Sequence, residues 1–156
     1  MAQPILLTGA AGFIGSWTAQ RLIAAGRPVV GVDNFDPFYS PEVKANNLSQ
    51  VDRSAPAGMW TFVRGDIADA PAMRELFDRV KPEGVIHLAA KAGVRPSIED
   101  PVGYSRANVM GTSVLLDAAR RAGCARIVVA SSSSVYGNSP KVPFAETNDV
   151  SEPISP

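Results

Sequence analysis

The chain has 156 residues, of which 46% are hydrophobic and 19% charged, and this composition is typical of one folded domain. Its 15 Lys and Arg residues balance 15 Asp and Glu residues, so the charge does not favour a nucleic-acid or anionic-membrane surface. A single cysteine, Cys124, excludes an intrachain disulfide, and with one histidine the chain offers no His/Cys metal cluster. We expect a cytoplasmic protein without a metal, in which Cys124 is a small buried hydrophobe near a helix end.

Short apolar runs alternate with helical patterns along the chain, as in a parallel sheet covered by helices. We expect strands at Ile5–Thr8, Val29–Asp33, Trp60–Arg64, Val85–Ala89 and Arg126–Ala130. We expect helices near Phe13–Ala25, Pro41–Val51, Pro71–Val80 and Pro101–Ala122. In the first helix, one face carries Ile14, Thr18, Leu22 and Ala25. The tail from Pro140 to Pro156 is rich in Pro, Ser, Asn and Glu, and we expect a loop there.

Glycines recur at every third position between the first strand and the first helix, at Gly9, Gly12 and Gly15. Gly9 permits a tight turn, Gly12 lets a pyrophosphate approach the backbone, and Gly15 lets the helix pack close to the strand. The free N–H groups near Phe13 and Ile14 would then face the phosphates. Such a glycine string is weak evidence alone, but here a strand precedes it and a helix follows it.

The second strand ends in an acid, Asp33, 18 residues beyond Gly15 (33 − 15). This spacing is close to that of the carboxylate that binds the adenosine ribose in dinucleotide-binding folds. A carboxylate accepts hydrogen bonds from the ribose hydroxyls and repels a 2′-phosphate, so the sequence favours NAD over NADP. The next residue, Asn34, is neutral, and we expect no arginine nearby to offset a 2′-phosphate.

Other candidates follow later strands. Asp66 and Ile67 follow the third strand, where the acid could accept from adenine and the isoleucine could pack on its ring, but a helix-capping Asp66 is equally compatible. Ala89 and Ala90 end the fourth strand, where small side chains either leave room for a cofactor or simply pack the core.

The histidine and the serines also have two interpretations each. His87 lies inside an apolar run, which favours a hydrogen-bonded core histidine over a general base. The serine run Ser131–Ser134 follows the fifth strand, where a hydroxyl either donates to a substrate oxygen or bonds to its own backbone.

With these residues assembled, the chain resembles the N-terminal part of an extended short-chain dehydrogenase/reductase, of the NAD-dependent epimerase/dehydratase type. The motifs that carry the resemblance are Thr8–Gly15, Asp33, Asp66-Ile67, His87–Ala90, Asn108 with Gly111-Thr112, and Ser131–Gly137. Two further stretches, Asp33–Tyr39 and Lys91–Pro101, look most like UDP-glucuronate 4-epimerases and other nucleotide-sugar 4-epimerases.

The resemblance implies a doubly wound parallel sheet in the order 3-2-1-4-5 and an NAD cofactor. The implied cofactor-binding residues are Gly9, Gly12, Phe13, Ile14, Gly15, Asp33, Asn34, Asp66, Ile67, Ala89, Ala90, Lys91 and Asn108. The implied catalytic serine is Ser132, four residues before Tyr136. In this family a tyrosine and a lysine in a Tyr-x-x-x-Lys pattern assist hydride transfer between the sugar and NAD.

The chain does not contain that pattern, because the residues four positions after Tyr39, Tyr104 and Tyr136 are Val43, Asn108 and Pro140. We therefore expect an NAD-binding domain at 1–137, a loop at 138–156 leading to an absent catalytic helix, no second domain, and no activity from this chain alone. The expected substrate of the parent enzyme is a nucleotide sugar. Another extended-family activity, such as 4,6-dehydration or one-way oxidation, and a non-catalytic NAD-binding module are the alternatives. We also expect self-association, because the fifth strand would lose a covering helix and become a sheet edge.

Overall fold

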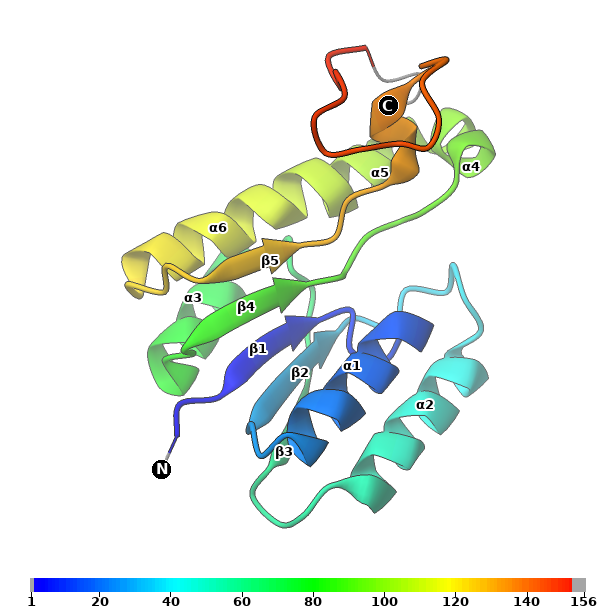
Figure 1. Ribbon diagram of the computed structural model, residues 1–156. Coiled ribbons are helices and arrows are strands. Elements are labelled where there is room, and N and C mark those ends of the chain that lie inside the picture. Colours follow the sequence, from blue (N-terminus) through cyan, green and yellow to red (C-terminus); the bar gives the residue numbers. More distant parts are fainter. Residues whose placement is uncertain (1, 153–156) are drawn as a thin grey trace.

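The computed structural model describes residues 2–152, which form a five-stranded parallel sheet in the order β3-β2-β1-β4-β5 (Figure 1). This order confirms the predicted topology. The strands are β1 (Ile5–Thr8), β2 (Val29–Asp33), β3 (Trp60–Arg64), β4 (Gly84–His87) and β5 (Ile127–Val129). β1 lies in the centre and pairs with both β2 and β4, so the loops that follow these three strands meet at the carboxyl edge of the sheet.

Helices cover both faces of the sheet (Figure 1). They are α1 (Phe13–Ala24), α2 (Pro41–Ser54), α3 (Ala70–Val80), α4 (Val94–Glu99), α5 (Pro101–Tyr104), a π-helical segment η1 (Ser105–Gly111), α6 (Thr112–Arg121) and a 3₁₀ helix η2 (Ser133–Tyr136). The predicted helix over 101–122 is therefore divided among α5, η1 and α6, and the sequence did not predict α4. No helix among the described residues is both long and apolar enough to cross a membrane.

Two clusters of buried side chains hold the layers together. One cluster joins the sheet to α3 and α6 through residues such as Leu6, Phe77 and Leu115. The other joins the opposite face to α1 and α2 through residues such as Leu7 and Val51. Consecutive residues of β1 thus point to opposite faces, and all five residues of β2 are buried, as expected for strands covered on both sides.

The buried face of α1 differs from the predicted face of Ile14, Thr18, Leu22 and Ala25, of which Leu22 packs against the core while Ile14 does not. Its buried residues are Gly15, Ser16, Ala19 and Ile23. A Cβ on Gly15 would lie 2.1 Å from the carbonyl oxygen of Gly9, so the helix turns its smallest residue toward the strand. Close packing at Gly15 therefore decides the orientation of α1, and Ile14 is left 65% exposed.

β5 forms one edge of the sheet and pairs only with β4 among the described residues. Val128 is 64% and Val129 47% exposed, so these two residues lack apolar cover, whereas Ile127 packs against the core. Residues 138–152 form neither helix nor strand, as predicted, and Figure 1 shows them gathered beyond the carboxyl end of β5. The rest of the predicted loop lies outside the described residues.

Candidate functional site

The turn between β1 and α1 requires glycine at two positions for steric reasons. Gly9 has a φ of +69°, and a Cβ there would lie 2.8 Å from the backbone nitrogen of Ala89. At Gly15, any Cβ would clash with the carbonyl oxygen of Gly9. Gly12, between them, has ordinary extended dihedral angles, and its N–H donates to the carbonyl of Gly9 at 3.0 Å. The absent side chain of Gly12 is therefore not needed for the turn itself but leaves the helix end open.

The N-terminus of α1 is suited to bind an anion. Gly12 provides no side-chain cap, and the first turn contains no acidic residue. The N–H groups of Phe13 and Ile14 have no partner within the helix, because an α-helix leaves its first amides free. Their side chains are 75% and 65% exposed, so this end is open to a ligand. Free amides and the helix dipole together favour a phosphate here.

Asp33 ends β2 beside this turn and is only 7% exposed. One carboxylate oxygen accepts from the N–H of Ala11 at 3.2 Å, which fixes the side chain against the glycine turn. The other accepts from the N–H of Phe35 at 2.8 Å. Phe35 has a φ of +60°, a conformation that L-residues rarely adopt. The loop after β2 therefore bends sharply around the carboxylate that the sequence identified.

Two cations lie next to Asp33, which corrects the expectation that no arginine stands nearby. Lys44 of α2 contacts the carboxylate with its Nζ at 3.2 Å. Arg64 is the register partner of Asp33 on β3, and its guanidinium carbon lies 5.1 Å from the centre of the Phe35 ring. The sequence pattern missed both residues, because neither is close to Asp33 along the chain.

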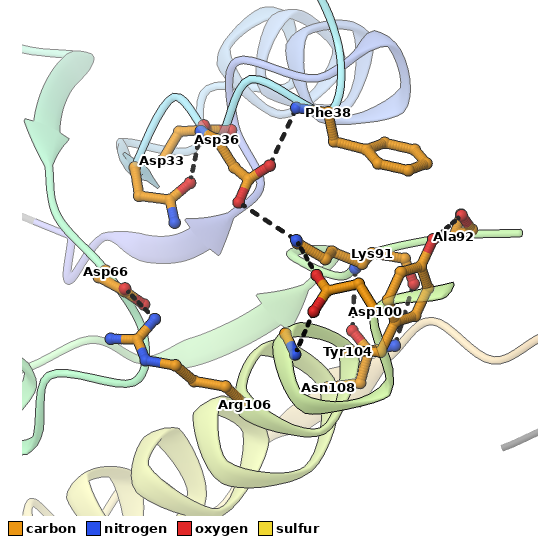
Figure 2. Close-up of polar contacts among 12 residues, drawn as sticks. Asp33, Asp36, Phe38, Asp66, Lys91, Ala92, Asp100, Tyr104, Arg106 and Asn108 are labelled. Atoms are coloured by element: carbon orange, nitrogen blue, oxygen red, sulfur yellow. Dashed lines mark hydrogen bonds and ion pairs between the residues drawn. The ribbon is translucent and has the colours of Figure 1, made fainter. Parts of the chain in front are cut away.

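Asp66 follows β3 and belongs to a polar pair. It accepts from Arg106 at 2.7 Å (Figure 2) and from the N–H of Ala68 at 2.9 Å. Burial raises the pKa of Asp66, but the Ala68 amide and the Arg106 guanidinium outweigh it and hold the pKa below its usual value. The N-cap of α3 is Asp69, whose side chain accepts from the N–H of Ala72, so Asp66 is not the cap. Ile67 lies in the core, with its side chain in the cluster that contains α3 and α6.

Asn34 and the small residues after β4 complete this edge. Asn34 is exposed, accepts from the N–H of Asp36 at 2.8 Å, and also bonds to Asp66. Ala89 is half-buried, with its N–H 3.2 Å from the hydroxyl oxygen of Thr8, and Ala90 is exposed. The structure therefore brings Ala89 and Ala90 to the carboxyl edge and leaves Ala90 exposed.

His87 is a core histidine, as the apolar run around it predicted. Its Nδ1 lies 2.7 Å from the hydroxyl of Thr8, and its Nε2 lies 2.9 Å from the hydroxyl of Thr112. The ring thereby ties β4 to β1 and to α6 directly below the glycine turn. Burial lowers the pKa of His87, because the charged form would lose its hydration.

This depressed pKa predicts how stability depends on pH. The folded state favours neutral His87, so its contribution is complete above the unfolded pKa of about 6.5 and is lost as the pH falls from there toward the folded pKa. We expect the free energy of unfolding to decrease by up to about 1.4 kcal/mol per pH unit in that range. Urea titrations from pH 7.5 to 5 measure this slope. Since this is the sole histidine of the chain, His87→Gln should remove the slope, and an unchanged slope in that variant would contradict the assignment.

Lys91 connects the loops that follow β2 and β4. Figure 2 shows its ammonium group between Asp36 and Asp100, at 3.8 Å and 3.1 Å from their carboxylates. The hydrogen bond to Asp100 raises the pKa of Lys91. Asn108 of η1 holds the Lys91 backbone from both sides, accepting from its N–H at 2.9 Å and donating to its carbonyl at 3.0 Å. Because β1 lies between β2 and β4, this bridge crosses above the carboxyl end of β1.

An aromatic contact reinforces the same bridge. The hydroxyl of Tyr104 donates to the carbonyl of Ala92 at 2.6 Å, and its ring meets Phe38 edge to face with centres 6.4 Å apart. Phe38 belongs to the loop after β2, whereas Ala92 belongs to the loop after β4. The two loops are therefore held together at the carboxyl edge of the sheet by both charge and packing.

The serine segment lies at the same edge, after β5. Ser132 is exposed and caps η2, accepting from the N–H of Ser134 at 3.2 Å, which is the local bonding that the sequence left open. Tyr136 stacks on Phe144 with ring centres 4.4 Å apart. Ser132 thus lies at the carboxyl edge of the sheet and is exposed.

Three comparisons place this arrangement among known proteins. The family model described as GDP-mannose 4,6 dehydratase matches residues 6–156. UDP-glucuronate 4-epimerase 3 of Arabidopsis thaliana is 41% identical over 152 residues, which are 97% of this chain and 34% of that protein. The chain therefore spans about a third of the length of this relative.

Solved structures give the same result. The UDP-glucose-4-epimerase of Stenotrophomonas maltophila, with bound NAD and formylated UDP-arabinopyranose, is 34% identical, with a TM-score of 0.82 over 95% of this chain and 42% of that one. The UDP-glucose 4-epimerase of Brucella ovis in complex with NAD is 36% identical, with a TM-score of 0.80 over 99% of this chain and 43% of that one. The chain therefore belongs to the GDP-mannose 4,6 dehydratase family, within the extended short-chain dehydrogenases/reductases.

Proposed function

We propose that residues 1–137 bind NAD across the carboxyl edge of the sheet and form the cofactor-binding domain of a nucleotide-sugar 4-epimerase of the UDP-glucuronate type. The observation that carries the proposal is the glycine turn whose open helix end lies beside the buried carboxylate of Asp33. That pairing provides an anion site for the pyrophosphate and an acceptor for the ribose hydroxyls. The relatives named above support an epimerase over a dehydratase or an oxidase, because each of these individual proteins is named as a 4-epimerase.

Bound NAD would supply a hydride acceptor, and the residues of this chain would hold it in place. The α1 amides would bind the pyrophosphate, Asp33 the adenosine ribose, and Asn34 with Asp66 the adenine side. Ser132 would donate a hydrogen bond to an oxygen of the sugar. The bridge of Lys91 would retain the dinucleotide over the turn.

Thermal denaturation with added NAD tests the binding proposal. A ligand that binds the folded state stabilises it by about 2.7 kcal/mol when its concentration is 100 times its dissociation constant. We expect the melting temperature to rise with NAD concentration and to rise less with NADP. Nicotinamide mononucleotide, which lacks the adenosine half, is the control ligand. A melting temperature that does not change with NAD would contradict the proposal.

We expect no epimerase turnover from the 156-residue chain alone. The chain contains no Tyr-x-x-x-Lys pattern, and a positioned general base contributes about 10²- to 10⁴-fold to such reactions. The measurement is chromatographic analysis of UDP-glucuronate incubated with NAD and the pure protein. Formation of UDP-galacturonate above a protein-free control would show that another residue, such as Ser132 or Tyr136, acts as the base.

We propose that the open edge of β5 mediates self-association with a second copy of the chain. The strand presents Val128 and Val129 to solvent and offers unpaired backbone groups at the sheet edge. Light scattering across a dilution series should show a mass that increases with concentration. Val128→Lys should reduce this increase, whereas Val142→Lys, at an exposed position in the tail, should not. A monomer at every concentration would contradict the proposal.

A further inference from the structure

Two positively charged side chains, Lys44 and Arg64, lie around the single carboxylate of Asp33. Asp33 and Lys44 are each 7% exposed, and no polar atom of either side chain is left without a partner among the described residues. Arg64 adds a second positive charge on the same side of the sheet, because paired residues of parallel neighbouring strands point to the same face. Among the described residues no acid pairs with Arg64, so one carboxylate faces two cations.

Both cations, Lys44 and Arg64, lie near the ring of Phe35. Lys44 Nζ lies 5.9 Å and the Arg64 guanidinium carbon 5.1 Å from its centre. Both are within the range in which an aromatic face attracts a cation. The backbone of Phe35 is in turn tied to Asp33 through its N–H. The loop after β2 therefore holds Lys44, Arg64 and Asp33 around one site at the end of the strand.

Asp33 already has three hydrogen-bond donors before any ligand binds. These are the N–H groups of Ala11 and Phe35 and the ammonium group of Lys44. A carboxylate has about four lone-pair sites, so these donors leave about one free, whereas a ribose diol has two hydroxyl donors. One of the hydroxyls must therefore compete with Lys44 for the carboxylate. Lys44 has three N–H donors and a flexible stem, so it can turn one donor toward a ligand oxygen while it keeps its contact with Asp33.

We propose that Lys44 and Arg64 are specificity-determining residues of the ribose site, and that Asp33 masks a latent pocket for a 2′-phosphate. Lys44 neutralises the buried carboxylate and orients it toward the ribose. When the carboxylate is removed, Lys44 and Arg64 present two positive charges to the position where a 2′-phosphate would lie. The same pocket would then prefer NADP. This inference rests on the proposed NAD site.

One pair of variants tests the role of Lys44 by titration calorimetry with NAD and NADP. Asp33→Ser should shift the ratio of NADP to NAD affinity by about 100-fold or more and reverse the preference, since charge-assisted bonds to phosphate are among the strongest polar contacts. Asp33→Ser combined with Lys44→Met should lose most of that shift. The same ratio in both variants would overturn the role of Lys44.

Arg64→Met provides a second test, which does not require the Asp33→Ser variant to fold. Arg64 is exposed and lies outside the core, so its replacement should leave the fold intact. In the otherwise natural chain, Arg64→Met should weaken NADP binding more than NAD binding and lower the ratio of NADP to NAD affinity by about tenfold. An equal effect on both cofactors, or no effect, would overturn the role of Arg64. AMP and adenosine 2′,5′-bisphosphate serve as smaller probes that differ only in the 2′-phosphate.

A purely structural role of Lys44 predicts a different result. Such a role would lower the melting temperature of Lys44→Met and leave the ratio of the two affinities unchanged, and that result would overturn the inference. Lys44→Arg keeps the charge and should retain the preference of the natural chain. Failure of the natural chain to bind either cofactor would instead contradict the proposed function, so the two failures are distinguishable.

Discussion

Gly12→Val is expected to abolish measurable NAD binding while the chain stays folded. The β-branched side chain would project over the open end of α1, where the proposed function places the pyrophosphate against the N–H groups of Phe13 and Ile14. We expect the affinity to fall by at least about 100-fold, because contact between phosphate and backbone requires close approach. Calorimetric titration with NAD measures the loss.

The fold should tolerate this change. Gly12 has a φ of −72° and a ψ of 170°, which any residue can adopt, and a Cβ there would lie 3.2 Å from the carbonyl oxygen of Gly9. We expect a loss of stability of about 1 kcal/mol, typical of an apolar residue at an N-cap with a tight contact. Gly12→Ala is the matched control and should bind NAD with intermediate affinity. Binding by Gly12→Val equal to that of the natural chain would contradict the position of the pyrophosphate.

Gly15→Ala is expected to destabilise the chain by about 3 kcal/mol or more, the upper range for overpacked sites. In an exposed helix, replacing glycine by alanine would stabilise the fold by up to about 1 kcal/mol. The sign of the change in the free energy of unfolding therefore distinguishes the buried contact from an exposed position. The added Cβ would lie 2.1 Å from the oxygen and 2.8 Å from the carbon of the Gly9 carbonyl. These are backbone atoms, and Gly9 cannot move away because it is itself packed against the backbone of Ala89.

Urea denaturation measures this effect, and Gly65→Ala is its control. A Cβ on Gly65 would meet side-chain atoms of Met73 and Val32 at 3.7 Å and 3.8 Å, which is ordinary contact. We expect that variant to remain within about 1 kcal/mol of the natural chain. Equal stability of Gly15→Ala and the natural chain would show that α1 can move away from β1, and the close approach would lose its role in orienting the helix.

The features that were predictable from the sequence are those encoded locally. The glycine turn and Asp33 lie in one continuous strand–helix–strand unit, where spacing alone places them together. The apolar runs defined the strands, and the alternation with helices led to the correct class of fold. His87 was predicted as a core residue from its apolar neighbours, and the structure adds Thr8 and Thr112 as its partners.

The features that the sequence did not predict depend on contacts between residues far apart in the chain or on the small volume of a glycine. Lys44 of α2 contacts Asp33, and Arg64 of β3 is its register partner, only because of the tertiary fold, and no local sequence pattern predicts that proximity. Similarly, Arg106 meets Asp66 across 40 positions of sequence. The orientation of α1 was missed because apolar spacing was given more weight than the small volume of Gly15. A glycine inside a predicted helix was the available signal for that face.

Titration calorimetry of the natural chain with NAD and NADP tests most directly whether the glycine turn and Asp33 form a site for NAD. We expect saturable binding of NAD with one site per chain. We expect NADP to bind more weakly, since a 2′-phosphate would meet the carboxylate of Asp33. Absence of binding, or binding of NADP as tight as that of NAD, would contradict the account.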